Sequence, residues 1–266
     1  MNQLPIKNNF KTLYGLSVFL MVLTVSVSLS GLIFQDILYP TKELLSTFVP
    51  NDYVNLIIGF PLMLISLILI QKKKWIGLQI WPGALFYIIY VYLPYLISVP
   101  VNYLFIPYLL LFTISIYLLI SLMASIDYSS LEEDFSLSKS VKFPAGVLIS
   151  LSLLIIIRQL VLMITAITNQ SLVTLQEMSL WIDDFVIASP MMILTGILLW
   201  KKKGLGYAAA PGMLLAYACL SFSLLPFLYI QSKIKNVAFD MEALIILSMM
   251  SIICIVPFVL LIRKKK

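Results

Sequence analysis

Residues 58–85 read IGFPLMLISLILIQKKKWIGLQIWPGAL: a proline within an apolar segment, a lysine triplet, and a second apolar segment broken by Pro-Gly. Residues 187–214 follow the same plan without a gap and read IASPMMILTGILLWKKKGLGYAAAPGML. The matched positions lie 129 residues apart and are Pro61 and Pro190, the triplets 72–74 and 201–203, Gly77 and Gly206, Pro82 and Pro211, and Gly83 and Gly212. Apolar residues at several further positions are also identical in this register. The chain is therefore predicted to contain two like halves.

The composition is that of an integral membrane protein. Of the 266 residues, 61% are hydrophobic and 11% are charged, and several apolar runs are long enough to span a bilayer. The formal charge of +6 would suit a nucleic-acid partner if the cations covered one face. They cluster instead at the ends of apolar runs, where positive charge sets membrane orientation. We therefore expect the lipid bilayer, and no nucleic acid, as a partner.

Catalytic and metal-binding signatures are missing. The chain has no histidine, the commonest general base and the commonest metal ligand. It also has no nucleophile elbow, phosphate loop or paired-cysteine motif. Cys219 and Cys254 lie inside apolar runs, so they do not indicate a disulfide framework. We expect no metal, no cofactor and no enzymatic activity.

Eight apolar runs predict an all-α fold with eight transmembrane helices. They span 13–34, 54–70, 75–97, 103–125, 143–167, 184–200, 205–230 and 241–262. Residues 1–125 then form a first four-helix repeat, 126–142 a polar linker, and 143–266 a second repeat. An even number of spans in each half gives both halves the same orientation, so the repeats are parallel. A signal peptide is the competing interpretation of 13–34; a retained helix is favoured because the second half has a matching one.

Charge predicts the orientation of this topology. The lysine triplets, the linker lysines and the basic residues near both termini fall on one side, which the positive-inside bias makes cytoplasmic. Both termini are therefore predicted to be cytoplasmic, in the cell membrane. The other side holds polar segments at 36–53, with a short surface helix near 43–48, at 168–183 and at 231–240. These three segments are predicted to lie outside the membrane.

Two pairs of prolines lie near the predicted centre of the membrane. Pro61 and Pro190 each precede a lysine triplet by 11 residues, about 16 Å along a helix, and Pro82 and Pro211 reach a similar depth. Proline removes a helical hydrogen bond, and matched interruptions in two halves are typical of a transporter binding site. Packing kinks are the alternative, since proline and glycine are common in spanning helices.

Arg158, with Gln159 beside it, is the only cation deep within an apolar run. Because an unpaired charge is costly there, we predict a role in binding, with Asp183 and Asp184 among the candidate partners. The alternatives are a structural ion pair between two helices and a side chain that reaches outward to the membrane surface.

Asp183 and Asp184 stand at the start of the predicted helix 184–200. They either cap this helix or form a mouth that attracts cations. The capping role is favoured because aspartate is common at helix starts.

Four tyrosines are spread around the helix predicted at 75–97. Tyr92 and Tyr95 suit an interfacial aromatic belt. Tyr87 and Tyr90 lie deeper and require hydrogen-bond partners, such as the carbonyls freed near Pro82.

Four segments share a further pattern: NDYVNLIIGFP (51–61), WPGALFYIIYVYLPYLI (81–97), VNYLFIPYLLLFTISIYLLI (101–120) and SPMMILTGILLWKKKGLGY (189–207). A Pro-centred helix pairs with a tyrosine-rich one, followed by an Asn-x-x-Phe turn at Asn102 and Phe105. This pattern resembles a family of uncharacterised prokaryotic polytopic membrane proteins. The resemblance implies the eight-helix plan of two four-helix repeats and no particular activity or substrate.

The leading hypothesis is a protein that binds or transports a small solute or lipid between its two repeats, using the proline-broken helices and Arg158. A non-transporting membrane subunit or assembly protein, with a membrane-protein partner, is the alternative, and an intramembrane enzyme is the third. The first predicts a polar cavity that reaches Pro61, Pro190 and Arg158. The second predicts a sealed apolar seam.

Overall fold

The computed structural model describes residues 10–129, 131–132 and 141–262, and this part of the chain is helical, without strands. The helices are α1 (Lys11–Ile33), α2 (Gln35–Leu38), α3 (Lys42–Val54), η1 (Asn55–Gly59), α4 (Phe60–Gln71), α5 (Trp75–Ser98), α6 (Phe105–Ser125), α8 (Lys142–Thr168), α9 (Leu175–Ile182), η2 (Asp183–Ala188), α10 (Ser189–Trp200), α11 (Gly204–Lys235) and α12 (Met241–Ile262). The π-helical turns η1 and η2 join α3 to α4 and α9 to α10 without a break.

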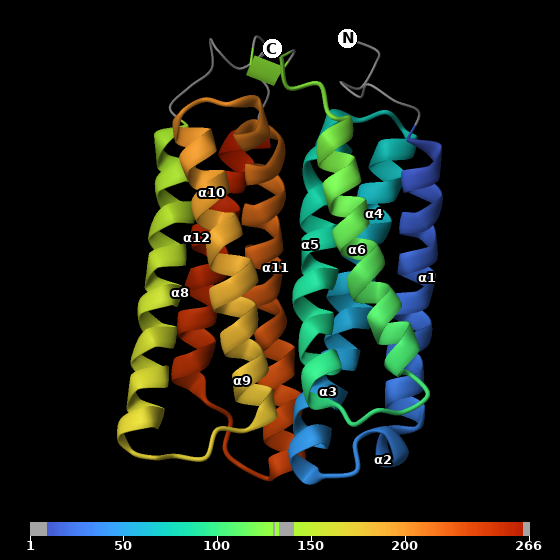
Figure 1. Ribbon diagram of the computed structural model, residues 1–266, viewed down its shortest axis with the longest axis vertical. Helices are drawn as coiled ribbons and strands as arrows, with labels where there is room; N and C mark the ends of the chain where they lie inside the picture. The colour runs from blue at the N-terminus through green and yellow to red at the C-terminus, as the bar shows by residue number, and fades with distance from the viewer. Residues whose placement is uncertain (1–9, 130, 133–140, 263–266) are drawn as a thin grey trace.

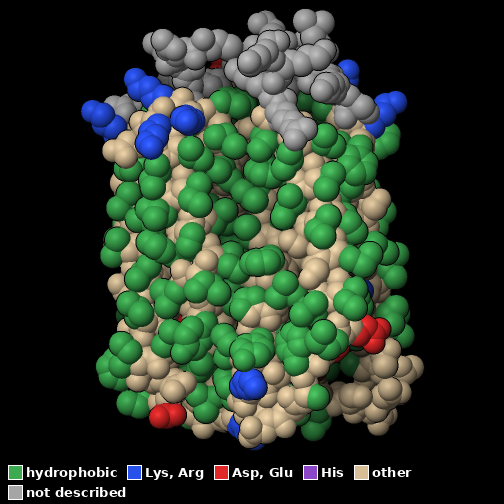
Figure 2. Space-filling view, turned by 180° about the vertical axis from the view of Figure 1, so that it is seen from behind, with side chains coloured by type: hydrophobic (Ala, Val, Ile, Leu, Met, Phe, Trp, Pro, Cys, Tyr) green, Lys and Arg blue, Asp and Glu red, His purple; other side chains and the backbone are tan. Residues whose placement is uncertain are grey.

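Within the described ranges, eight helical segments are long and apolar enough to cross a membrane, as predicted. They are Lys11–Ile33, Lys42–Gln71, Trp75–Ser98, Phe105–Ser125, Lys142–Thr168, Leu175–Trp200, Gly204–Lys235 and Met241–Ile262. Most of them expose large hydrophobic side chains, to an extent that is rare in water-soluble proteins. These side chains cover the middle of the bundle, and most of the visible lysines and arginines gather at one end (Figure 2). The fold is that of a multi-pass membrane protein.

The helices form two groups that meet at α5 and α11 (Figure 1). One cluster of buried apolar residues is built mainly by α1 and α3–α6, and the other mainly by α8 and α10–α12. Phe86 of α5 belongs to the second cluster and Ala208 of α11 to the first. The α1 helix begins, and α12 ends, at the end of the bundle where both lysine triplets lie.

The polar segments at the opposite end are more helical than predicted. The external segment predicted at 36–53, with a short helix near 43–48, is helical over a longer range. The Thr41 hydroxyl accepts a hydrogen bond from Leu44 N–H and caps α3, which continues to Val54. From there the helix runs without a break into the span. Asp52, which made this stretch look like a loop, is fully buried in the bundle.

The other two predicted external segments are also shorter. The α9 helix begins at Leu175, after a capping box between Thr174 and Glu177, so only the residues before it connect the spans. The α11 helix continues to Lys235, into the predicted turn at 231–240. Polar residues were assigned to loops because their partners inside the bundle cannot be read from local sequence.

A π-helical turn precedes the central proline in each group. Phe60 N–H donates to Asn55 O in η1, and Ser189 N–H donates to Asp184 O in η2, five residues back in both cases. The next residue is Pro61 or Pro190, which has no N–H to donate. The wider turn accommodates this missing hydrogen bond while the helix continues.

The two lysine triplets turn the chain in the same way. Lys73 and Lys202 have positive φ angles of 54° and 57°. The next N–H, of Lys74 or Lys203, donates at 2.9 Å to Leu69 O or Leu198 O. This Schellman-type hydrogen bond closes the helix and leaves the lysine side chains exposed.

Much of the predicted linker 126–142 lies outside the described residues, including Glu133, Asp134 and Lys139. In its described part, Glu132 Oε1 accepts a hydrogen bond of 2.7 Å from Gly204 N–H. This carboxylate therefore lies at the start of α11, where negative charge is favourable.

Candidate functional site

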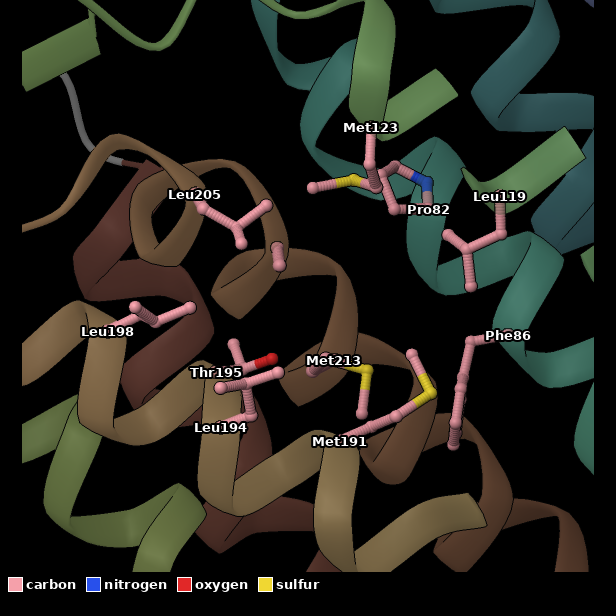
Figure 3. A pocket seen from close by; sticks show the side chains of 11 residues that line it. Pro82, Phe86, Leu119, Met123, Met191, Leu194, Thr195, Leu198, Leu205 and Met213 are labelled. Carbon is pink, nitrogen blue, oxygen red and sulfur yellow. The ribbon is translucent and has the colours of Figure 1, made fainter. Parts of the chain in front are cut away.

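An apolar cavity of about 140 Å³ lies between the two groups of helices (Figure 3). Its walls include Pro82 and Phe86 of α5, Leu119 and Met123 of α6, Leu194 of α10 and Met213 of α11. Thr195 is the one polar side chain in the lining. Leu194 is 57% exposed, so the wall of the cavity extends to the apolar outer surface.

Next to this cavity, α5 and α11 touch backbone to backbone at their Pro-Gly motifs. A Cβ atom added to Gly83 would lie 2.2 Å from Gly212 O, and one added to Gly212 would lie 2.7 Å from Gly83 N. Only glycine permits helices to approach this closely. The contact seals this part of the junction and places Pro82 in the cavity wall.

Side chains from three helical segments meet at Asp184, inside η2. Tyr90 Oη of α5 donates to Asp184 Oδ1 at 2.8 Å, and Gln159 Nε2 of α8 donates to Asp184 Oδ2. One donor thus comes from each group of helices, and Asp184 is only 9% exposed. The arrangement fixes this carboxylate at the junction.

Asp183 is completely buried beside it, and neither of its carboxylate oxygens has a hydrogen-bond partner among the described residues. Tyr217 Oη and Gln159 Oε1 are also buried, and the described part of the chain offers neither of them a hydrogen-bond partner. Tyr217 and Tyr90 lie close enough to both carboxylates to interact electrostatically. Because buried polar atoms are normally satisfied, these oxygens mark a candidate binding site. Its residues, Asp183, Asp184, Tyr90, Gln159 and Tyr217, are named here the junction acid site.

Arg158 is exposed on α8, although Gln159 beside it is buried. It lies within electrostatic reach of Asp184, one of its predicted partners. In the described part of the chain, Asp184 receives its hydrogen bonds from Tyr90 and Gln159. Arg158 therefore acts on this site through its charge.

A third buried carboxylate, absent from the predicted site, lies in the first group of helices. Asp52 is 0% exposed and accepts hydrogen bonds from Tyr39 Oη at 2.7 Å and from Tyr95 Oη at 2.8 Å. Burial, with the Asp52 carboxylate adding to it, raises the pKa of Tyr39 far above its ordinary value, so the hydroxyl remains a donor. Asp52, Tyr39 and Tyr95 form what is named here the closed acid site.

Gly31 of α1 makes room for the closed acid site. A Cβ atom at this position would lie 1.9 Å from Asp52 Oδ2. The signal that the sequence offers for this site is Tyr95, one of the four tyrosines spread around its helix.

The predicted tyrosine roles are partly wrong. Tyr92 and Tyr95 do not form an interfacial belt, because both are buried and their rings pack on Tyr108. The partner of Tyr90 is Asp184 rather than a carbonyl near Pro82. Tyr87 is buried, and its hydroxyl has no hydrogen-bond partner in the part of the chain that the structure describes.

The favoured capping role of Asp183 and Asp184 is also wrong. Their helix begins at Leu175, so both residues lie in its interior.

The four prolines do not converge on one cavity. Pro82 and Pro211 are buried at the junction, Pro61 is half-buried and Pro190 is exposed. Only Pro82 lines the cavity, which does not reach Arg158. The apolar cavity at the junction therefore does not join the prolines to Arg158.

No protein-family model, no curated protein and no solved structure matches this chain. Its function is therefore inferred from its own residues.

Proposed function

We propose that this protein is a multi-pass membrane protein that binds the acyl chain of a membrane lipid between two four-helix halves. The observation that carries the proposal is the apolar cavity bounded by α5, α6, α10 and α11. Its volume of about 140 Å³ is below the range of roughly 300–1,000 Å³ for whole small-molecule ligands. It is close to the roughly 150 Å³ of an apolar cavity that holds benzene. A hydrocarbon segment fits this space, whereas a polar solute would leave its hydrogen bonds unmade.

We take the halves to be parallel repeats, 1–125 and 143–266, joined by the linker 126–142. The π-helical turns before Pro61 and Pro190 support this arrangement, as do the left-handed residues Lys73 and Lys202. All of these features share the 129-residue spacing of the sequence repeat. The equivalent glycines of the two copies also touch one another, as expected where a pseudo-two-fold axis along the membrane normal passes between parallel repeats.

The proposed orientation places both lysine triplets, and with them both chain termini, on the cytoplasmic side of the cell membrane. Leu198 and Leu205 line the cavity and flank the second triplet, Lys201–Lys203. A lipid with its chain in the cavity would have its phosphate near these ammonium groups. Anionic lipids of the cytoplasmic leaflet are therefore the preferred occupants.

The substitution Ala209→Phe tests this proposal. Ala209 of α11 lines the cavity, and a phenyl ring there would occupy the space of an acyl segment. Displacing roughly two methylene groups should lower the retention of anionic phospholipid about tenfold. The measurement is native mass spectrometry of the purified protein, which reports the fraction of molecules that carry a phospholipid.

Ala166→Phe is the matched control, because it adds the same ring to α8, outside the cavity lining. This variant should retain lipid as the wild type does. Wild-type retention by folded Ala209→Phe protein would contradict the proposal. Equal loss in both variants would also contradict it, because the bound lipid would then belong to the outer surface.

The second candidate function is a non-transporting membrane subunit or assembly protein. The backbone contact between Gly83 and Gly212 favours it, because this contact seals the junction where a solute path would run. Cross-linking in native membranes should then capture one membrane protein at equal stoichiometry. The subunit function would be supported over lipid binding if the Ala209→Phe variant still captured this partner protein and retained lipid as the wild type does.

A further inference from the structure

The junction acid site, which the apolar cavity does not include, carries an imbalance of charge. Two carboxylates, Asp183 and Asp184, are buried within a membrane-spanning segment, and one guanidinium, that of Arg158, lies within electrostatic reach. With both carboxylates ionised, the described contacts of this site leave one negative charge without a counter-charge. An ionised carboxylate in such surroundings is costly unless it is paired.

The unsatisfied atoms of this site are all oxygens, and they come from three elements. Asp183 of η2 supplies two, Gln159 of α8 supplies Oε1 and Tyr217 of α11 supplies Oη. Tyr217 is 7% exposed and Gln159 is 1% exposed, so water has little access to either. The Gln159 amide donates to Asp184 through Nε2, which leaves Oε1 available as an acceptor. Oxygen ligands are those that hard metal cations prefer.

We propose that the junction acid site binds one monovalent metal cation, Na⁺ or K⁺. Asp183 is the charged ligand, and Tyr217 Oη and Gln159 Oε1 are the neutral ligands. The charge count selects a monovalent ion, because one added positive charge, together with that of Arg158, neutralises the two carboxylates. A divalent ion would leave an excess charge within the membrane. The bound ion links η2 to α8 and α11, next to the hydrogen bond that joins Asp184 to α5.

Thermal unfolding of the purified full-length protein, followed by the fluorescence of its four tryptophans, tests the proposal. The protein is compared in sodium chloride, potassium chloride and choline chloride at equal ionic strength. The ion that binds should raise the midpoint by roughly 5–10 °C at about a hundredfold excess over its Kd. The comparison of the two metal salts identifies the ion, and choline, a bulky organic cation, sets the baseline.

Asp183→Asn removes the charged ligand and should abolish the rise. Tyr217→Phe keeps every charge and removes one neutral ligand. It should therefore fold and raise the half-saturating ion concentration about tenfold, the effect of one lost polar contact. Asp52→Asn is the control, because both oxygens of this buried carboxylate already have donors. Its midpoint should still respond to the ion.

Equal stability of the wild type in all three salts would overturn the proposal. The same rise in Asp183→Asn as in the wild type would also overturn it, and so would an unchanged half-saturating concentration in folded Tyr217→Phe. A midpoint that changes with pH but with neither metal ion would assign the site to a proton and exclude the cation. Lipid retention is measured separately, so this result and that of the lipid proposal are independent.

Discussion

The two acid sites differ in how their carboxylates are satisfied, although each lies ahead of the central proline of its helix. In the closed acid site, both oxygens of Asp52 accept hydrogen bonds from tyrosines of the same helix group. In the junction acid site, Asp184 is held by donors from both groups, and Asp183 has no hydrogen-bond partner among the described residues.

This difference gives the two acid sites different roles, one in the stability of the fold and one in ligand binding. A buried carboxylate with two phenol donors stabilises the helices that supply them. A buried carboxylate without a donor, placed where two groups of helices meet, lowers stability until a ligand arrives. The closed acid site therefore maintains the first group of helices, and the junction acid site is the place for a ligand.

The largest expected effect is on the closed acid site, in the variant Gly31→Ala. Its Cβ atom would lie 1.9 Å from Asp52 Oδ2 and force the carboxylate away from its two donors. The free energy of unfolding should fall by about 3 kcal/mol, measured by denaturant titration in detergent micelles. Gly15→Ala on the same helix meets open space and should change stability by no more than about 1 kcal/mol. Equal stability of the two variants would break the account of Asp52 as a tightly enclosed group.

A smaller effect is expected when one tyrosine hydroxyl is removed from each site. The two tyrosines, Tyr95 and Tyr90, lie on the same helix, so the variants are directly comparable. Tyr95→Phe removes one of two donors from the fully buried Asp52 and should cost about 2 kcal/mol. Tyr90→Phe should cost about 1 kcal/mol, because Asp184 keeps the Gln159 donor and the charge of Arg158. The effect on the half-saturating ion concentration should show the reverse order. This concentration should change in Tyr90→Phe and not in Tyr95→Phe. An altered ion response in Tyr95→Phe alone would contradict this division of roles.

The smallest effect is expected from Arg158→Ala. The side chain is exposed, so stability in choline chloride should change by less than about 0.5 kcal/mol. The half-saturating ion concentration should fall about threefold, because a competing positive charge has been removed. Arg158→Lys keeps the charge and should behave as the wild type does. Weaker ion binding in Arg158→Ala would mean that Arg158 helps to hold the ligand rather than competing with it.

The spans were predictable from sequence because each is a long apolar run, which needs no knowledge of its neighbours. The helix start near Leu175 was not, nor was the continuity of the helix near 43–48 with the span that follows it. Asp52 and Asp183 suggest loops when they are considered locally, and only the packed bundle shows that both are enclosed.

The candidate site was predictable only in part. The sequence predicted that Arg158, with Gln159 beside it, could pair with Asp183 and Asp184. Tyr90 was singled out separately for its depth, and the structure joins it and Gln159 to Asp184. Tyr217 had no distinguishing sequence signal, since a single tyrosine in an apolar helix is usually a packing residue. The prolines were predicted as site residues because they occupy matched positions in the repeat. The direction each one faces depends on the rotation of its helix, which residue spacing does not determine.

The most direct test of the contrast between the two acid sites is equilibrium binding of radioactive sodium and of radioactive rubidium, which substitutes for potassium, to the purified protein. One of the two ions should bind at one per chain to the wild type and to Asp52→Asn, and should not bind to Asp183→Asn. Absence of binding to the wild type, or equal binding by Asp183→Asn and Asp52→Asn, would contradict the account.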